Sequence, residues 1–100
     1  MKTYVILRRK AWATPKLLER AAERSRRIGD TEMSDRIRWI RSYVINDDGQ
    51  LGTVCIYQAQ DEQSIREHAQ RADLPADEIF EVADVVVVRP DPQPAGAQPA

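Results

Sequence analysis

The stretch that decides the fold is residues 37–58, which read IRWIRSYVINDDGQLGTVCIYQ. From Arg36 to Ile45 successive side chains alternate between two sets, and this period of two is typical of a β-strand. The sequence at 46–49, Asn-Asp-Asp-Gly, favours a tight turn, because these residue types tolerate positive φ angles. Leu51 to Gln58 then returns as a second strand. The stretch therefore predicts an antiparallel β-hairpin.

A strand and a helix are predicted on the N-terminal side of this hairpin. Residues 3–7 are rich in β-branched and aromatic types, which favour a strand. Thr14 is a suitable helix N-cap and Pro15 a suitable first helical residue. Apolar residues then recur at helical spacing as far as Ile28, and Gly29 is a suitable stop. We expect the first helix to span residues 15–28.

A second helix and a last strand are predicted on the C-terminal side. Asp61 can cap the helix, and Leu74-Pro75 marks its end. The last strand is expected over residues 79–88, because the four valines at 85–88 are β-branched and favour a strand. Residues 89–100 hold most of the prolines, so we expect them to form a flexible, extended tail.

The predicted order of elements is β-α-β-β-α-β. This order is typical of the ferredoxin-like α+β fold, a four-stranded antiparallel sheet with two helices on one face. A chain of 100 residues has room for one domain only. We therefore predict one domain at residues 1–88, followed by the tail at 89–100.

The composition argues against several classes of protein. The formal net charge is −1, whereas a general nucleic-acid binder carries a clear basic excess. No apolar run approaches the roughly 20 residues that span a bilayer, and the apolar stretch at the N-terminus is too short for a signal peptide. The single cysteine, Cys55, excludes an internal disulfide and fits a reducing compartment. We expect a cytoplasmic protein that binds neither nucleic acid nor membrane.

The second face of the predicted sheet needs a cover, because both helices lie on the first. Strand alternation divides the large residues of the hairpin between the two faces. The open face is predicted to carry Trp39, Tyr43, Cys55 and Tyr57, and the face beneath the helices Ile40, Val44, Val54 and Ile56. Large side chains are rarely exposed together as one patch. We therefore predict a homodimer, a dimeric α+β barrel whose sheets face each other; the alternative is a monomer with an amphipathic open face.

Three segments carry a resemblance to a known family. They are IRWIRSYV at 37–44, VCIYQAQDE at 54–62, and the pair IREHA at 65–69 and LPADEI at 74–79. In this order and spacing they resemble a family of small bacterial proteins of largely unassigned function, one branch of which is nickel-binding and nickel-responsive. The resemblance covers roughly residues 3–84, and it implies a ferredoxin-like fold and a dimer.

The chain departs from this family at positions that bear on a metal site. Where the family has a histidine near the end of the first strand, this chain has Arg8-Arg9, and where it often has a second histidine this chain has Arg41. Of the family's histidines only His68 is present. The family's glycine before Leu-Pro-Ala is Asp73 here. Arginine offers no lone pair and repels a cation, so the departures weaken a nickel site.

Nickel binding would depend on few donors in this chain. Nickel needs several nitrogen, oxygen or sulfur atoms that converge on one point. The candidates are His68, Cys55 and carboxylate oxygens. Each of the first two also has a structural interpretation, since His68 borders the apolar face of its predicted helix and Cys55 is a small residue in mid-strand. If His68 reaches a cleft, it is the best general acid or base in the chain.

The arginines point to a different ligand. Arg9 and Arg41 are both expected on the open face of the sheet. Guanidinium groups bind carboxylates and phosphates, and aromatic side chains stack on planar ligands. We therefore expect a pocket for an acidic or aromatic small molecule, lined by Arg9, Trp39, Arg41, Tyr43, Tyr57 and His68. The alternative is that the two arginines form salt bridges across the dimer.

Three functions are compatible with the sequence. The first is a dimeric ligand-binding protein of the nickel-responsive type with its metal site altered. The second is an enzyme of the cyclase, isomerase or cofactor-free oxygenase type, by analogy of fold alone. Its acid-base and polarising groups would be Arg41, Tyr43, Tyr57 and His68. The third is a purely structural or interaction module.

Overall fold

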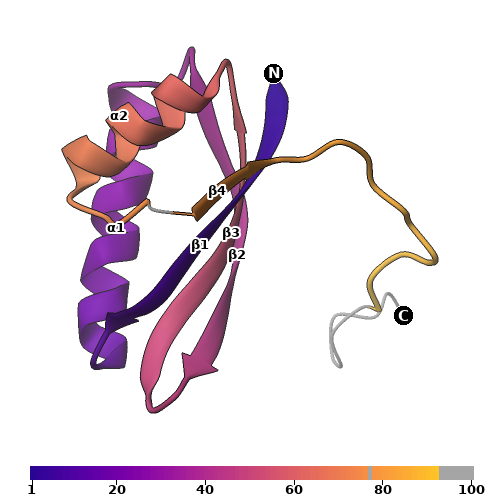
Figure 1. The fold of residues 1–100 in the computed structure, drawn as a ribbon. Helices are drawn as coiled ribbons and strands as arrows, with labels where there is room; N and C mark the ends of the chain where they lie inside the picture. The colour runs from indigo at the N-terminus through magenta and orange to yellow at the C-terminus, as the bar shows by residue number, and fades with distance from the viewer. Residues whose placement is uncertain (77, 93–100) are drawn as a thin grey trace, which may run out of the picture.

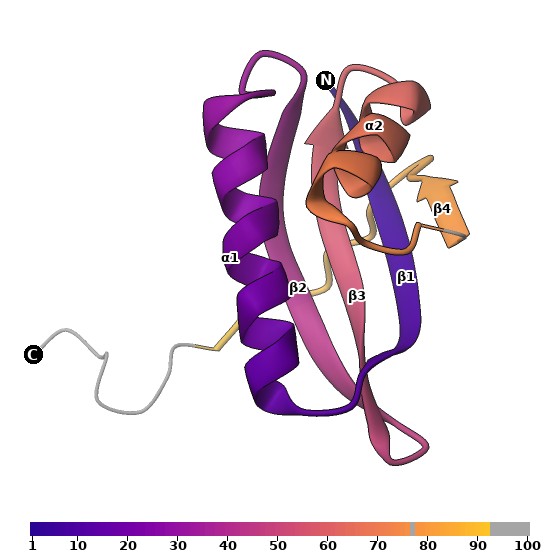
Figure 2. The ribbon, with the colours of Figure 1, turned by 90° about the vertical axis from the view of Figure 1, so that its left-hand side faces the viewer.

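The computed structural model describes residues 1–76 and 78–92, so residues 93–100 of the predicted tail lie outside the described residues. The elements are β1 (Lys2–Trp12), α1 (Pro15–Thr31), β2 (Ile37–Asp47), β3 (Gln50–Ala59), α2 (Glu62–Ala72) and β4 (Glu78–Glu81). The strands form one sheet in the order β2-β3-β1-β4, antiparallel at every contact. Both helices cover the same face of this sheet (Figures 1 and 2). The predicted ferredoxin-like α+β fold is confirmed.

Local sequence explains how the elements begin and end. At the hairpin, Asp48 and Gly49 have φ angles of 56° and 85°, as in the two-residue turn that matches the twist of paired strands. Thr14 and Asp61 cap α1 and α2 as predicted, each accepting a hydrogen bond from the backbone N–H three residues further on. Asp73 ends α2 in the left-handed conformation, with φ of 55°. Neither helix of the described chain is long and apolar enough to cross a membrane.

Two elements are longer than predicted. β1 continues beyond residue 7, because Trp12 still pairs with Leu51 of β3 after an irregularity in the register. α1 runs through Gly29, the predicted stop, as far as Thr31. Glycine permits a left-handed helix end without requiring one, and in this structure Gly29 keeps a negative φ angle.

β4 is shorter than predicted and ends at Glu81 instead of residue 88. It pairs antiparallel with β1 and therefore runs toward the N-terminal end of that strand. One further hydrogen bond joins the N–H of Val82 to the carbonyl of Thr3 at 2.8 Å, after which β1 has almost no backbone left to pair. The valines at 85–88 lie outside the sheet, with 65–88% of their surface exposed.

The predicted assignment of side chains to the two faces is wrong for most of the hairpin. Trp39, Cys55 and Tyr57, expected on the open face, lie beneath the helices, where Cys55 and Tyr57 belong to the core and Trp39 packs against it. Ile40, Val54 and Ile56, expected beneath the helices, lie on the open face instead. Tyr43 lies on the open face and Val44 beneath the helices, as predicted.

A β-bulge and an ambiguous strand explain this error. The bulge falls between Trp39 and Arg41, so the intervening residue is extra and the alternation of β2 changes phase there. As a result Trp39 and Ser42 share a face, and Trp39 Nε1 donates a hydrogen bond to Ser42 Oγ at 2.8 Å. β3 carries apolar residues on both sides, so its pattern does not tell which side faces the helices.

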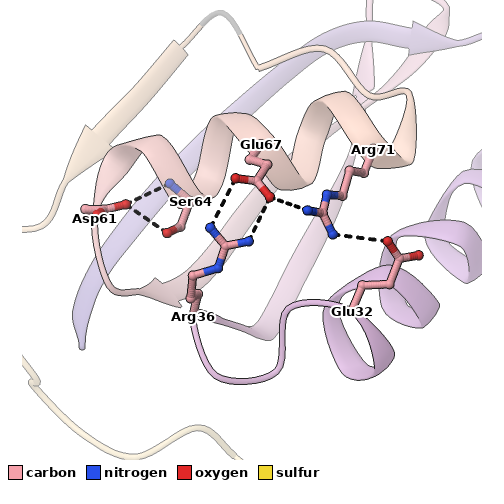
Figure 3. Close-up of polar contacts among 6 residues, drawn as sticks. All are labelled: Glu32, Arg36, Asp61, Ser64, Glu67 and Arg71. Atoms are coloured by element: carbon pink, nitrogen blue, oxygen red, sulfur yellow. Dashed lines mark hydrogen bonds and ion pairs between the residues drawn. The ribbon is translucent and has the colours of Figure 1, made fainter.

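A polar network ties the end of α1 to α2 and to the start of β2. Arg36 donates hydrogen bonds to both carboxylate oxygens of Glu67, at 3.1 and 2.7 Å. Arg71 pairs with Glu67 one turn earlier on α2 and with Glu32 at the end of α1 (Figure 3). These contacts hold both helices at one end of the sheet.

Replacing Glu67 with glutamine is expected to make folding less sensitive to acid. Hydrogen bonds from Arg36 lower the pKa of Glu67 below its ordinary value of 4.5. The ionised carboxylate therefore stabilises the folded state above that pH, and the stabilisation is lost as the pH falls through the lower pKa of the folded protein. Between about pH 5 and about pH 3 the urea midpoint of the unchanged protein should fall more steeply than that of Glu67→Gln. Glu19→Gln, at an exposed position of α1, is the control; equal slopes for Glu67→Gln and the unchanged protein would contradict the expectation.

Candidate functional site

A cavity of about 290 Å³ lies between α1 and the sheet. On the helix side its wall is made mainly of small residues at helical spacing, Ala21, Ala22 and Ser25, which leave space above the strands. On the sheet side it is lined by Arg8, Trp39, Thr53, Cys55 and Tyr57, among others. The wall is therefore largely apolar, with a few polar groups at defined places.

Arg8 is the unusual member of this wall. Its side chain is only 2% exposed, and it follows Tyr4 and Ile6 on the inward side of β1. Just beyond it the pairing of β1 with β3 is interrupted. Gly52 of β3 allows the close approach there, because a Cβ atom at that position would lie 2.6 Å from the carbonyl oxygen of Arg8. Because Gly52 has no side chain, the backbone of β1 can lie close to β3 at Arg8.

The guanidinium group of Arg8 is only partly satisfied. Its Nε donates to the carbonyl of Pro75 at 2.7 Å, and Nη1 donates to Sγ of Cys55 at 3.1 Å. Among the described residues Nη2 is buried and has no hydrogen-bond partner, and no carboxylate pairs with the group. Burying a charged donor without a counter-ion is costly. The cavity therefore contains a positive group whose Nη2 can still donate hydrogen bonds.

Two aromatic rings form the floor beside Arg8. Trp39 and Tyr57 are stacked, with ring centroids 6.1 Å apart and planes 7° from parallel. The guanidinium carbon of Arg8 lies 5.9 Å from the centre of the Tyr57 ring, within reach of a cation–π attraction. The hydroxyl of Tyr57 bonds to Oγ of Ser25 at 3.0 Å. Burial raises the pKa of Tyr57, so this phenol stays protonated at neutral pH.

His68 supports the site from behind and does not line the cavity. It is 1% exposed, and its Nε2 lies 2.9 Å from the backbone carbonyl oxygen of Ser25. A carbonyl only accepts hydrogen bonds, so Nε2 carries the proton and Nδ1 keeps its lone pair. Nδ1 is buried without a partner among the described residues. His68 thus fixes Ser25, which in turn holds the hydroxyl of Tyr57.

The structure divides the predicted pocket residues between the two faces of the sheet. Trp39 and Tyr57 share the cavity beneath α1, together with Cys55. Arg41 and Tyr43 lie on the open face, so neither shares a site with Tyr57 or His68. The four groups assigned to an acid-base site therefore do not come together within one chain.

Arg9 and Arg41 share the open face but lie apart on it. Arg41 is level with Val5 across β3, and Arg9 is four residues further along β1, a separation of roughly 13 Å along the strand. Arg9 pairs with Glu78 at 2.8 Å, and Arg41 pairs with Asp91 at 3.3 Å. Arg8 is absent from the pocket predicted from sequence, although its place two positions after Ile6 indicates that its side chain points to the same side of β1 as that core residue.

The residues present do not fit a nickel centre. Among the described residues no three histidine, cysteine, aspartate or glutamate side chains gather in one place. The nearest charged neighbour of Cys55 is the guanidinium of Arg8, which repels a cation. His68 uses its protonated nitrogen on the backbone of Ser25. Of the two donors predicted for nickel, Cys55 is thus held by Arg8, and His68 offers only its buried Nδ1, around which no cluster of three donors forms in the described part of the chain.

Comparison with known proteins identifies relatives of the chain. Residues 4–82 match the family model described as "Nickel responsive protein SCO4226-like". The fold is similar to the crystal structure of SCO4226 from Streptomyces coelicolor A3(2), with a TM-score of 0.67 and 18% sequence identity over 84% of this chain and 99% of that one. No curated protein matches the sequence. At this identity the structural likeness establishes a shared fold alone.

His68 is expected to make folding sensitive to mild acid. Burial lowers the pKa of His68 below its ordinary value of 6.5, so the unfolded chain binds a proton there more readily than the folded one. Stability is then highest above pH 6.5 and falls as the pH drops toward the lowered pKa of the folded protein. His68→Gln should abolish this slope between about pH 7.5 and about pH 5.5 and cost about 1–3 kcal/mol at neutral pH. Urea denaturation measures both; a slope unchanged by His68→Gln would refute the assignment, and Glu67→Gln is the control.

Proposed function

Because this chain belongs to the nickel-responsive SCO4226-like family, we propose that it is a homodimeric binding protein of that family in which the metal site has given way to a site for a small organic carboxylate. The site is the cavity beneath α1. One observation carries this proposal: the buried guanidinium of Arg8 lines an apolar cavity, and its Nη2 has no partner among the described residues.

A carboxylate would supply the hydrogen-bond acceptor and the negative charge that Arg8 does not find among the described residues. An anionic oxygen would accept the free hydrogens of Nη2 and neutralise the buried charge, and such charge-assisted hydrogen bonds contribute about 1.5–3 kcal/mol each. Removal of water from the cavity would strengthen this attraction. A neutral ligand would leave the charge uncompensated, and a cation would be repelled.

The rest of the wall favours a compact, planar and apolar body for the ligand. A volume of about 290 Å³ suits a molecule with a single ring. The stacked pair Trp39 and Tyr57 offers an aromatic surface, and the alanines of α1 leave room opposite it. We therefore expect a single-ring aromatic acid to bind better than a small inorganic anion.

The open face supports the dimer. Ile40 and Tyr43 lie on it, and so does Phe80, which pairs with Val5 of β1; they have 45%, 53% and 52% of their surface exposed. Neither helix covers that face (Figure 1). Apolar side chains grouped in this way are typical of an interface, and a two-fold axis lets the same patch cover itself.

Benzoate is expected to stabilise the protein through Arg8. At ten times its dissociation constant a ligand adds about 1.4 kcal/mol, or roughly 7 °C in the melting temperature of a domain of this size. Benzamide, the neutral analogue, should give no shift. Arg8→Met should abolish the benzoate shift without lowering the stability of the free protein, because it removes a buried charge that no described carboxylate pairs with. Arg9→Met, at the exposed neighbour on the other face, is the matched control.

Two results would reject the carboxylate site. One is a benzoate shift that survives in Arg8→Met, and the other is the absence of any shift with benzoate and with larger single-ring acids such as phenylacetate. Asp77→Asn removes the carboxylate that stands two residues after Pro75 in the sequence, and it should leave the shift intact.

A chemical readout of the same site comes from Cys55, the only cysteine in the chain. Iodoacetate carries a carboxylate that Arg8 would attract, after which the sulfur displaces iodide and forms a carbon–sulfur bond. The ratio of alkylation rates, iodoacetate over iodoacetamide, should fall at least several-fold in Arg8→Met. Mass spectrometry follows the single adduct, and an unchanged ratio would count against the site.

Nickel is expected not to bind stoichiometrically to this chain. The reason is that Arg8 bonds to Cys55, and that Nδ1 of His68, which keeps its lone pair, is not part of any cluster of three donors among the described residues. Titration of the purified protein with nickel chloride in a calorimeter should give no saturable heat. Saturable binding that is lost in both His68→Gln and Cys55→Ser would overturn this expectation.

A further inference from the structure

The chain carries a C-terminal arm, residues 82–91, on the open side of the sheet. The family match ends at residue 82, so the arm follows the shared fold. Figure 1 shows it standing off from the sheet on the side opposite both helices. A groove of about 1010 Å³ separates the arm from the open face, lined on the sheet side by residues such as Val5, Tyr43 and Ile56.

The arm is tied to the sheet at both ends. At its start the N–H of Val82 bonds to the carbonyl of Thr3 at 2.8 Å. At its end Asp91 pairs with Arg41 of β2 at 3.3 Å. Between these ties the arm does not pack on the sheet, and its valines at 85–88 are 65–88% exposed.

Two apolar surfaces therefore face each other across the groove, and both stay largely exposed. On one side are the arm's valines, and on the other the exposed Ile40 and Tyr43 of β2. Burying apolar side chains is favourable in proportion to the apolar area that is removed from water. The free energy available from burying the four valines is comparable in size with the stability of a small domain.

We propose that the arm is a clasp that lies across the open face of a second copy of this chain. This inference rests on the homodimer proposed above and adds the segment that holds it together. The valines of each arm pack on the partner's open face, and Asp91 of each arm pairs with the partner's Arg41. The contact that one chain makes within itself is then remade between chains, as in the exchange of an identical element.

The charges of the chain favour a second copy as the occupant. The arm ends in an acidic residue, Asp91, that already matches an arginine of the open face, Arg41. Under a two-fold axis this one pair becomes two, because each copy supplies both partners. An unrelated protein would have to reproduce both the apolar strip and the paired charge, whereas a second copy supplies them by symmetry.

Charge reversal separates exchange between chains from contact within one chain. Arg41→Asp alone and Asp91→Arg alone each place like charges together, so each should raise the dimer dissociation constant roughly tenfold at low salt. In a 1:1 mixture of the two variants, both pairs between chains become attractive again. Sedimentation of the mixture should therefore show a heterodimer close to the original affinity. A contact within one chain would remain repulsive in both partners, and no recovery on mixing would overturn the clasp.

A second variant tests the apolar part. Val86→Asp should raise the dimer dissociation constant at least tenfold, and Leu17→Asp, at an exposed site of α1 on the helix side, should not. Deletion of residues 83–100 should weaken the dimer as strongly as Val86→Asp. If the deleted chain and Val86→Asp both dimerise like the full chain, the clasp is wrong while the dimer stands. If the full chain is monomeric at every concentration, the proposed dimer fails as well, and the benzoate experiment still decides the carboxylate site separately.

Discussion

The site depends on one constraint: folding takes the guanidinium group of Arg8 out of water, and no carboxylate among residues 1–76 and 78–92 pairs with it. Arg8 recovers part of the lost hydration from the carbonyl of Pro75, the sulfur of Cys55 and the face of Tyr57. Neutral acceptors of this kind compensate a buried charge only in part. A chain that keeps such a group in its core either tolerates the cost or recovers it when an anion binds. The cavity beside Arg8 makes the second explanation physically available.

The same arrangement explains how a family fold associated with nickel can suit an anion. A metal site needs convergent lone pairs, and among the described residues no three histidine, cysteine, aspartate or glutamate side chains gather in one place. The chain's single histidine, His68, is buried and bonded to the backbone of α1. Through Ser25 it holds Tyr57, so it contributes to the site by positioning the aromatic wall. The fold can thus keep a histidine and a cysteine near its core while their chemistry serves packing.

The sheet separates the proposed ligand site from the proposed dimer interface. Its helix-covered face encloses Arg8 and the aromatic pair, and its open face carries exposed apolar residues and the C-terminal arm. A ligand beneath α1 and a second copy on the open face would therefore not compete for space. Any effect of ligand binding on dimerisation would pass through β1 and β3, because successive residues of these strands point alternately to the two faces.

Local sequence preferences predicted most of the fold. The hairpin turn at 46–49, the caps Thr14 and Asp61, and the order of elements are all readable from the sequence, because turn and cap preferences act over a few neighbouring residues. The structural interpretation of His68 also followed from the sequence, because the residue borders the apolar face of its predicted helix. The predicted site contained Trp39 and Tyr57, which do line the cavity, but it assigned them to the wrong face and chose Arg9 in place of Arg8.

Only the tertiary structure decided which side chains of each strand face the helices and where the last strand ends. A single extra residue at the bulge in β2 turns Trp39 inward, and β3, apolar on both sides, takes its orientation from the helices that cover it. β4 ends where β1 runs out of backbone to pair, which releases the valines at 85–88 from the sheet. The amino-acid sequence by itself determined which elements form, because secondary-structure propensity is local. Which side of each strand is buried depended on pairing between segments far apart in the chain. No single segment encodes that pairing.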